Sequence, residues 1–208
     1  MVACLKNEIK EKSIFRVEFG EYKSFEEAEA CIKTIKAKKL NGFIVKEDGY
    51  KVIYGVFLSS DEAVRAKDSI VAKAACRVTE IKLPGYSLSY NEEDNTFIQL
   101  VQAADKLIWD VAGAKSMLCL ETAMKSKKDM AGIFDMIMNG ESKLEKYLGY
   151  AEDINVPKEL KNFRENFEIL LKDVLSYRLG SDKDYYKLQE SLLNQVEAYR
   201  KFTEKLSI

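Results

Sequence analysis

The chain has 208 residues, of which 47% are hydrophobic and 32% charged, and its formal net charge is −1. This composition is that of a folded protein of one or two domains, and the charge balance does not suggest a nucleic-acid partner. Histidine is absent, so the chain lacks the usual general base at neutral pH and the commonest metal ligand.

The four cysteines, Cys4, Cys31, Cys76 and Cys119, are far apart and form no C-x-x-C pair. We expect buried thiols that pack as small apolar side chains in a reducing setting. No P-loop, dinucleotide-binding glycine pattern or zinc-ligand spacing occurs, so we predict no cofactor, no metal site and no catalytic residue. No apolar segment has transmembrane length, and the N-terminus lacks the apolar region of a signal peptide.

An internal repeat relates residues 14–35 to residues 49–70 at an offset of 35. A window of this length gives only about one identity by chance. The identical pairs are Val17/Val52, Gly20/Gly55, Ser24/Ser59, Glu27/Glu62, Ala28/Ala63 and Ile35/Ile70. The sequence therefore predicts one structural unit in two copies.

Each copy begins with an alternating run, 15–19 or 50–54, that predicts a half-buried strand. A capping box follows, Ser24 with Glu27 or Ser59 with Glu62, and opens a helix with apolar residues at helical spacing. A second strand, 43–45 or 78–83, ends each copy, and residues 47–50 are expected to form the turn between the copies.

The order β-α-β-β-α-β predicts a ferredoxin-like, four-stranded antiparallel sheet over residues 14–84, with both helices on one face and the other face open. If the apolar residues of the first and third strands face the helices, Arg16, Glu18, Lys51 and Ile53 point outward on the open face. Such a face is either ordinary solvated surface or a binding surface for an extended polymer.

Outside this region we expect an N-terminal lead-in at 1–13 and a linker at 85–95. Residues 96–208 carry four apolar stripes at helical spacing, the second interrupted near Asn139 and Gly140, which predict an antiparallel four-helix bundle. The whole chain is therefore α+β. Trp109 lies beside the main stripe of the first long helix, and is either an exposed partner contact or part of the bundle packing.

The pattern V-x-x-G-x-[FY], present as Val17–Tyr22 and again as Val52–Phe57, resembles the SPOR (sporulation-related) domain. So does the E-A pair that opens each helix, Glu27-Ala28 and Glu62-Ala63. The resemblance implies a β-α-β-β-α-β fold that binds peptidoglycan glycan strands, stripped of their stem peptides, through the open sheet face. By position it implies glycan-binding roles for Arg16, Glu18, Glu21, Lys51 and Ile53, although Glu18 and Glu21 depart from the usual family residues.

We therefore expect a non-enzymatic cell-wall binding protein of division or sporulation, whose helical domain binds another protein of these processes or acts as a spacer. Its place would be between membrane and cell wall in a Gram-positive anaerobe, if an anchor absent from this chain precedes it. The alternative is a cytoplasmic interaction or regulatory protein that binds a protein or small ligand through the same face. An enzyme is the third possibility.

Overall fold

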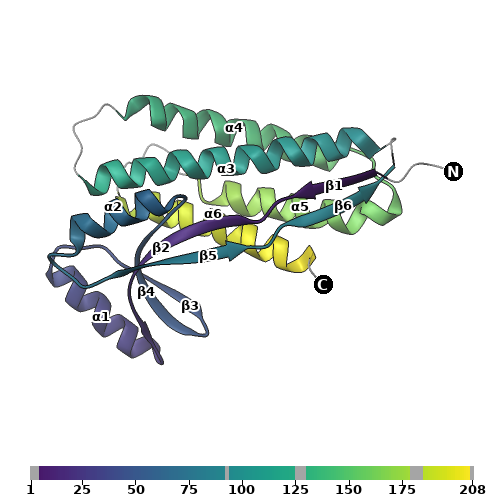
Figure 1. The fold of residues 1–208 in the computed structure, drawn as a ribbon. Helices are drawn as coiled ribbons and strands as arrows, with labels where there is room; N and C mark the ends of the chain where they lie inside the picture. Colours follow the sequence, from purple (N-terminus) through teal and green to yellow (C-terminus); the bar gives the residue numbers. More distant parts are fainter. Residues whose placement is uncertain (1–4, 92–93, 125–129, 179–184, 207–208) are drawn as a thin grey trace.

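The computed structural model describes residues 5–91, 94–124, 130–178 and 185–206, so Cys4 lies outside the described residues. Within these ranges the chain has an α+β fold with six helices and two antiparallel sheets (Figure 1).

The larger sheet contains the sequence repeat. Its strand order is β3-β4-β2-β5, and all neighbouring strands are antiparallel. The tight β3–β4 turn has the predicted position, and Gly49 adopts a positive φ of 105° there, which favours glycine. The elements are β2 (Lys12–Tyr22), α1 (Phe25–Ala37), β3 (Phe43–Glu47), β4 (Gly49–Phe57), α2 (Ser60–Ile70) and β5 (Arg77–Leu83).

Both predicted capping serines cap their helices. The Ser24 Oγ accepts a hydrogen bond from the Glu27 N–H at 3.2 Å, and the Ser59 Oγ accepts one from the Glu62 N–H at 3.2 Å. Each glutamate carboxylate reaches back to the N–H of the residue before its serine, at 3.0 Å for Glu27 and 3.3 Å for Glu62. The two helices thus start in the same way because the two copies share the same local sequence.

Helices α1 and α2 pack on one face of the sheet. Val17 and Val52 are fully buried there and belong to one core with apolar residues of both helices, as the alternating pattern predicts. Of the three described cysteines only Cys119 is fully buried, whereas Cys31 and Cys76 are half-buried.

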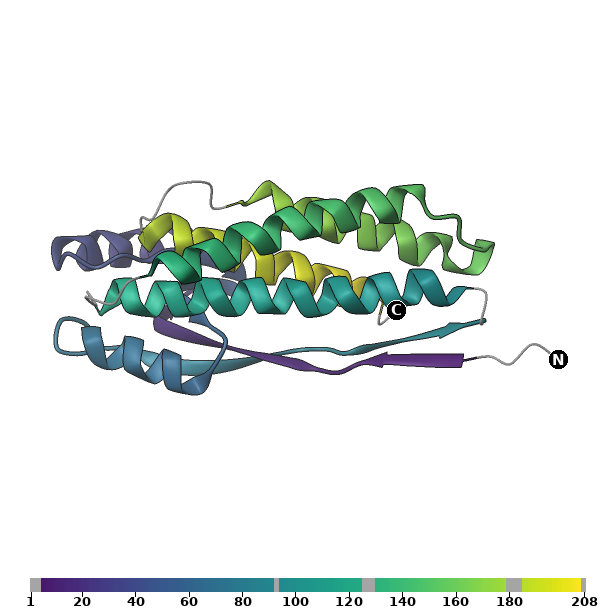
Figure 2. The same ribbon diagram turned by 90° about the horizontal axis from the view of Figure 1, so that it is seen from above.

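The segments predicted to be a lead-in and a linker contain paired strands. Strand β1 (Leu5–Ile9) pairs with β6 (Tyr86–Tyr90) in a two-stranded sheet. This ribbon prolongs β2 and β5 and runs beside the long helices (Figures 1 and 2). Asn7 accepts a hydrogen bond from Gln102, and the Tyr86 ring packs edge-on against Phe202 at 5.4 Å. The ribbon therefore gains its stability from the helices rather than from its own short sequence.

Four helices follow: α3 (Asn95–Ala123), α4 (Ala131–Asp153), α5 (Lys158–Ser176) and α6 (Tyr185–Leu206). Each contacts the next, and α6 contacts α3, so the four helices surround a common core. Helix α4 is continuous where an interruption was expected. Gly140 lies inside it because a Cβ there would be 2.3 Å from Val111 Cγ2, so the glycine permits close approach of α3 and α4. Pro157 immediately precedes α5, where its fixed φ suits the start of a helix.

Candidate functional site

The face of the sheet opposite α1 and α2 is not open, and the expectation that it would be is wrong. Helices α3 and α6 both contact β4. The Phe43 ring stacks on Tyr186 of α6 with ring centroids 4.6 Å apart. Apolar residues of β2, β3, β4 and β5 share one core with the long helices, namely Ile14, Phe43, Ile53, Val56 and Leu83.

Three of the residues predicted to bind glycan are buried. Ile53 is 0% exposed, Glu18 1% and Arg16 2%. Ile53 belongs to the shared core, and the amphipathic helices cover it because they must bury their own apolar stripes against another layer. A polymer has no access to the centre of this face while the helices are packed on it.

Arg16 and Lys51 occupy equivalent positions of the repeat and converge on Glu47, the last residue of β3. The Arg16 Nη2 lies 2.6 Å from Glu47 Oε1, and the Lys51 Nζ lies 3.1 Å from Glu47 Oε2. The hydrogen bond from Arg16, aided by the charges of Arg16 and Lys51, lowers the pKa of Glu47 from its ordinary value of 4.5 to about 2 against the opposing effect of burial. The two cations are thus held by an ion-pair cluster at the edge of the sheet.

Glu18 and Glu21 converge instead on Arg77, at the start of β5. The buried Glu18 Oε2 accepts hydrogen bonds from Arg77 Nε at 3.1 Å and from Thr79 Oγ1 at 2.9 Å. Arg77 Nη2 lies 3.7 Å from Glu21 Oε2. Glu18 Oε1 is buried as well, and it accepts no hydrogen bond within the described part of the chain.

These charged groups border a surface cavity of about 300 Å³, which we call the Gly20 pocket. A neighbouring cavity of about 550 Å³ shares Glu21 as a wall and extends along the end of the sheet to Asp48 and Gly49. Burial raises the pKa of the Cys76 thiol, which disfavours the thiolate form. The lining residues of the Gly20 pocket are Glu18, Phe19, Gly20, Glu21, Ala75, Cys76 and Arg77.

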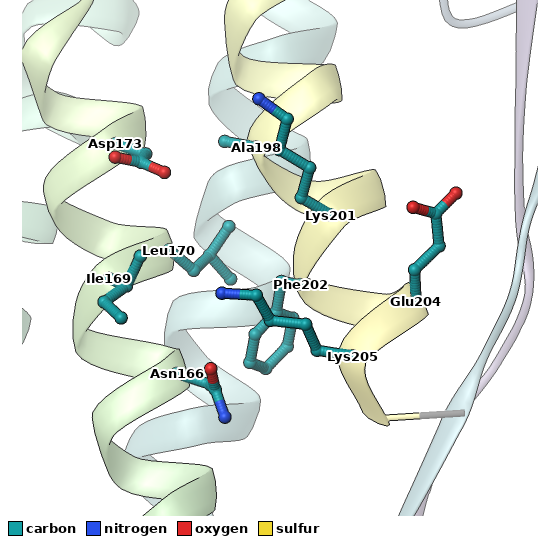
Figure 3. A pocket seen from close by; sticks show the side chains of 9 residues that line it. All are labelled: Asn166, Ile169, Leu170, Asp173, Ala198, Lys201, Phe202, Glu204 and Lys205. Atoms are coloured by element: carbon teal, nitrogen blue, oxygen red, sulfur yellow. The ribbon is translucent and has the colours of Figure 1, made fainter. Parts of the chain in front are cut away.

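A different cavity, of about 340 Å³, lies between α5 and α6 (Figure 3). Its floor is apolar, and its rim carries an acidic side chain from α5 and lysines from α6. This groove offers contact area to another protein, but no buried polar group that would orient a small substrate. The floor and rim consist of Leu170, Ala198 and Phe202, with Asn166, Ile169, Asp173, Lys201, Glu204 and Lys205.

Trp109 was expected to be either an exposed partner contact or part of the bundle packing, and in the structure it is partly buried and packs against the core. Its ring meets Tyr199 of α6 edge-on at 4.9 Å, and the Lys12 Nζ lies 5.7 Å from the ring centroid. Tyr199 in turn donates a hydrogen bond of 2.6 Å to the buried Asp105. Trp109 thus joins the start of β2 to the helices.

A second buried ion pair lies between the helices. The Lys115 Nζ is 2.9 Å from Glu141 Oε1 and donates a hydrogen bond of 2.9 Å to Gln195. Burial lowers the pKa of Lys115, opposed by Glu141. Since Lys115 is 0% exposed and Glu141 2%, this cluster joins α3, α4 and α6 and is closed to a substrate.

The sequence interpretation missed Arg77, the cation that forms ion pairs with Glu18 and Glu21, two of the five residues predicted to bind glycan. The signal for it is positional. Arg77 directly precedes the predicted strand 78–83, and the antiparallel register places it opposite Glu18. Had the predicted strand begun one residue earlier, at Arg77, the sequence would have placed Arg77 opposite Glu18 and predicted their ion pair.

Within the described residues, no group of three or more carboxylates and thiols lies close enough together to hold a metal ion. None of the helices in these residues has both the length and the apolarity to cross a membrane. No family model, curated protein or solved structure matches the chain.

Proposed function

We propose that residues 14–84 form a ferredoxin-like module of the SPOR type, joined to a four-helix bundle formed by α3–α6. The strand order and the antiparallel pairing of the two repeat copies support this assignment. The ring of contacts among the four long helices supports the bundle.

We further propose that the protein is a non-enzymatic cell-wall binding protein that recognises peptidoglycan glycan strands, stripped of stem peptides, in cell division or sporulation. The proposal rests on the duplicated unit with its V-x-x-G-x-[FY] pattern. Because the long helices occupy the centre of the sheet face, glycan contact falls to the exposed end of the sheet. There Glu21 and Arg77 offer a carboxylate acceptor and a guanidinium donor to sugar hydroxyls, and the buried Glu18 holds Arg77 in place.

A pull-down with purified sacculi tests this function. The full chain should be retained better on sacculi that an amidase has stripped of stem peptides than on untreated sacculi. Arg77→Ala should lower retention by about tenfold, as expected for a loss of roughly 1.4 kcal/mol in binding. Lys82→Ala is the matched control, because Lys82 lies on the same strand and pairs with Glu11 away from the pocket. Equal and negligible retention on both preparations would rule the function out.

The second candidate function is that of a cytoplasmic interaction or regulatory protein. The covering of the sheet face by α3 and α6 favours it, because that face is then used inside the molecule. A partner would contact the groove between α5 and α6. Under this alternative, Lys201→Glu together with Lys205→Glu would abolish capture of the partner, and Arg77→Ala would leave it unchanged.

A further inference from the structure

The groove between α5 and α6 has an apolar centre at the surface of the molecule. Leu170 of α5 and Phe202 of α6 lie at its floor, and each is only 2% exposed. Ile169, on the α5 wall, is 46% exposed, so the single chain leaves this side chain largely in water. The groove thus offers apolar area that a second surface can bury.

The two walls of the groove carry charges of opposite sign. Helix α5 contributes Asp173, and α6 contributes Lys201 and Lys205. In the described part of the chain, Asp173 and Lys205 form no ion pair, and Lys201 contacts only a carboxylate of its own helix at 4.0 Å. Glu204, also on α6, is held by Arg200 and points away from α5 (Figure 3). The walls therefore present an acidic group and basic groups that are available to a partner.

The side chains of the two walls lie at matching levels along the groove, because α5 and α6 run in opposite directions (Figure 3). The three levels are Asp173 with Ala198, Leu170 with Phe202, and Asn166 with Lys205. The Lys201 ammonium group extends toward the Asp173 end of the groove. Each end of the groove thus has a cation on α6 and a carboxylate or amide on α5.

This arrangement of charges is complementary to itself. A twofold axis parallel to the helices, above the groove, sets α5 of one copy against α6 of a second copy at the same level. Asp173 of each copy then meets Lys201 of the other. A twofold axis across the groove instead sets α6 against α6, and brings Lys201 near Lys205 of the second copy, where like charges repel. The charges therefore favour the first arrangement.

We propose that the groove between α5 and α6 is the interface of a homodimer with its twofold axis parallel to these helices. Asp173 of each copy pairs with Lys201 of the other copy, and Ile169 packs into the other copy's groove. The dimer goes beyond both functions proposed above, because it requires neither a glycan nor a second protein.

The size of the facing surface sets the expected affinity. Helix α5 has 19 residues and α6 has 22. At a rise of 1.5 Å per residue and the usual helix spacing, the two helices present a face about 28 Å long and about 20 Å wide. Such a contact buries about 1,000 Å² in total, the lower end of specific interfaces, so we expect a weak dimer with a Kd of about 10–100 µM.

Analytical ultracentrifugation of the full chain tests the dimer. The wild type should pass from monomer to dimer between about 5 and 500 µM, a range that brackets the expected Kd. Asp173→Lys and Lys201→Asp should each stay monomeric, because each variant alone places like charges at both contacts. Mixed in equal amounts, the two variants should form a heterodimer with nearly the wild-type affinity, since both contacts again join opposite charges.

Both residues are exposed, so the variants should keep the wild-type melting temperature, which shows that they fold. Asp110→Lys is the control for the charge change, because Asp110 is exposed on α3 and does not line the groove. This variant should dimerise as the wild type does. A wild-type chain that stays monomeric overturns the proposal and leaves the groove to a different protein. A dimer that both single variants retain overturns the groove as its interface.

The apolar contact has a separate test. Ile169→Ser should weaken the dimer by about tenfold at both low and high ionic strength, because it removes buried apolar area and changes no charge. Added salt should weaken the wild-type dimer as well, since the Asp173–Lys201 contacts lie at the rim of the interface. An Ile169→Ser variant that associates as well as the wild type overturns the packing of Ile169 into the second copy.

Discussion

The outer edge of β2 and the outer edge of β4 occupy equivalent positions of the repeat and have the same strand pairing but different surroundings. Helix α6 covers the edge at Gly55 and Val56, whereas the edge at Gly20 and Glu21 borders a surface pocket. The repeat thus sets the backbone conformation of both edges. Whether an edge is covered or exposed depends on which copy the long helices pack against. A duplicated unit can therefore bury the edge of one copy under other elements and leave the same edge of the other copy at the surface.

The largest expected difference in stability is between variants of Tyr22 and Phe57, the aromatic residues that end the V-x-x-G-x-[FY] pattern in the two copies. Phe57 on the covered side is 0% exposed, whereas Tyr22 is half-buried. Phe57→Ala should lower the free energy of unfolding by about 3–5 kcal/mol, the usual cost of such a cavity. Tyr22→Ala should cost about 1–2 kcal/mol, because its site is less enclosed.

Urea denaturation of the two variants measures this difference through the midpoint and the m-value. Similar losses for both variants would mean that the helices contribute little to the covered edge.

The second effect concerns Glu47, where the equivalent cations Arg16 and Lys51 meet. Glu47→Gln should cost about 1–3 kcal/mol, because the buried Arg16 guanidinium loses its charged partner. The folded-state pKa of Glu47 lies below the unfolded one, so its stabilisation is present above pH 4.5 and is lost as the pH falls toward about 2.

Unfolding free energies measured across that pH interval should fall more steeply for the wild type than for Glu47→Gln. As a control, Glu26→Gln changes an exposed carboxylate on α1 and should keep the wild-type slope. Parallel curves for Glu47→Gln and the wild type would contradict the role of the Arg16–Glu47 pair.

The smallest effect compares the two capping glutamates. Glu62 accepts a hydrogen bond of 2.6 Å from Ser116 of α3 in addition to its bond to the Leu58 N–H. Glu27 is exposed, and within the described residues its carboxylate accepts a hydrogen bond only from the nearby Lys23 N–H. Glu62→Ala should therefore cost about 1–2 kcal/mol and Glu27→Ala about 0.5 kcal/mol. Thermal unfolding of the two variants, each compared with the wild type, gives the difference. A larger loss for Glu27→Ala would show that contact with α3 adds nothing to this cap.

Much of the fold follows from local sequence signals. The capping boxes at Ser24 and Ser59, the turn at Gly49 and the start of α5 after Pro157 depend on residues close together in the chain, so their hydrogen bonds and dihedral angles are predictable from the sequence. The missed strand β6 and the unbroken α4 depend instead on distant partners. Strand β6 exists because it pairs with β1, and Gly140 is tolerated because Val111 packs against it.

The candidate site divides in the same way. The period of a strand, by itself, assigned Arg16, Glu18, Lys51 and Ile53 to the side of the sheet away from α1 and α2. Only the tertiary structure decided that α3 and α6 cover that side, that Ile53 is core, and that Arg77 joins Glu18 and Glu21 at a pocket. The physical reason is that side-chain alternation is a property of one strand, whereas exposure depends on every layer that packs against it.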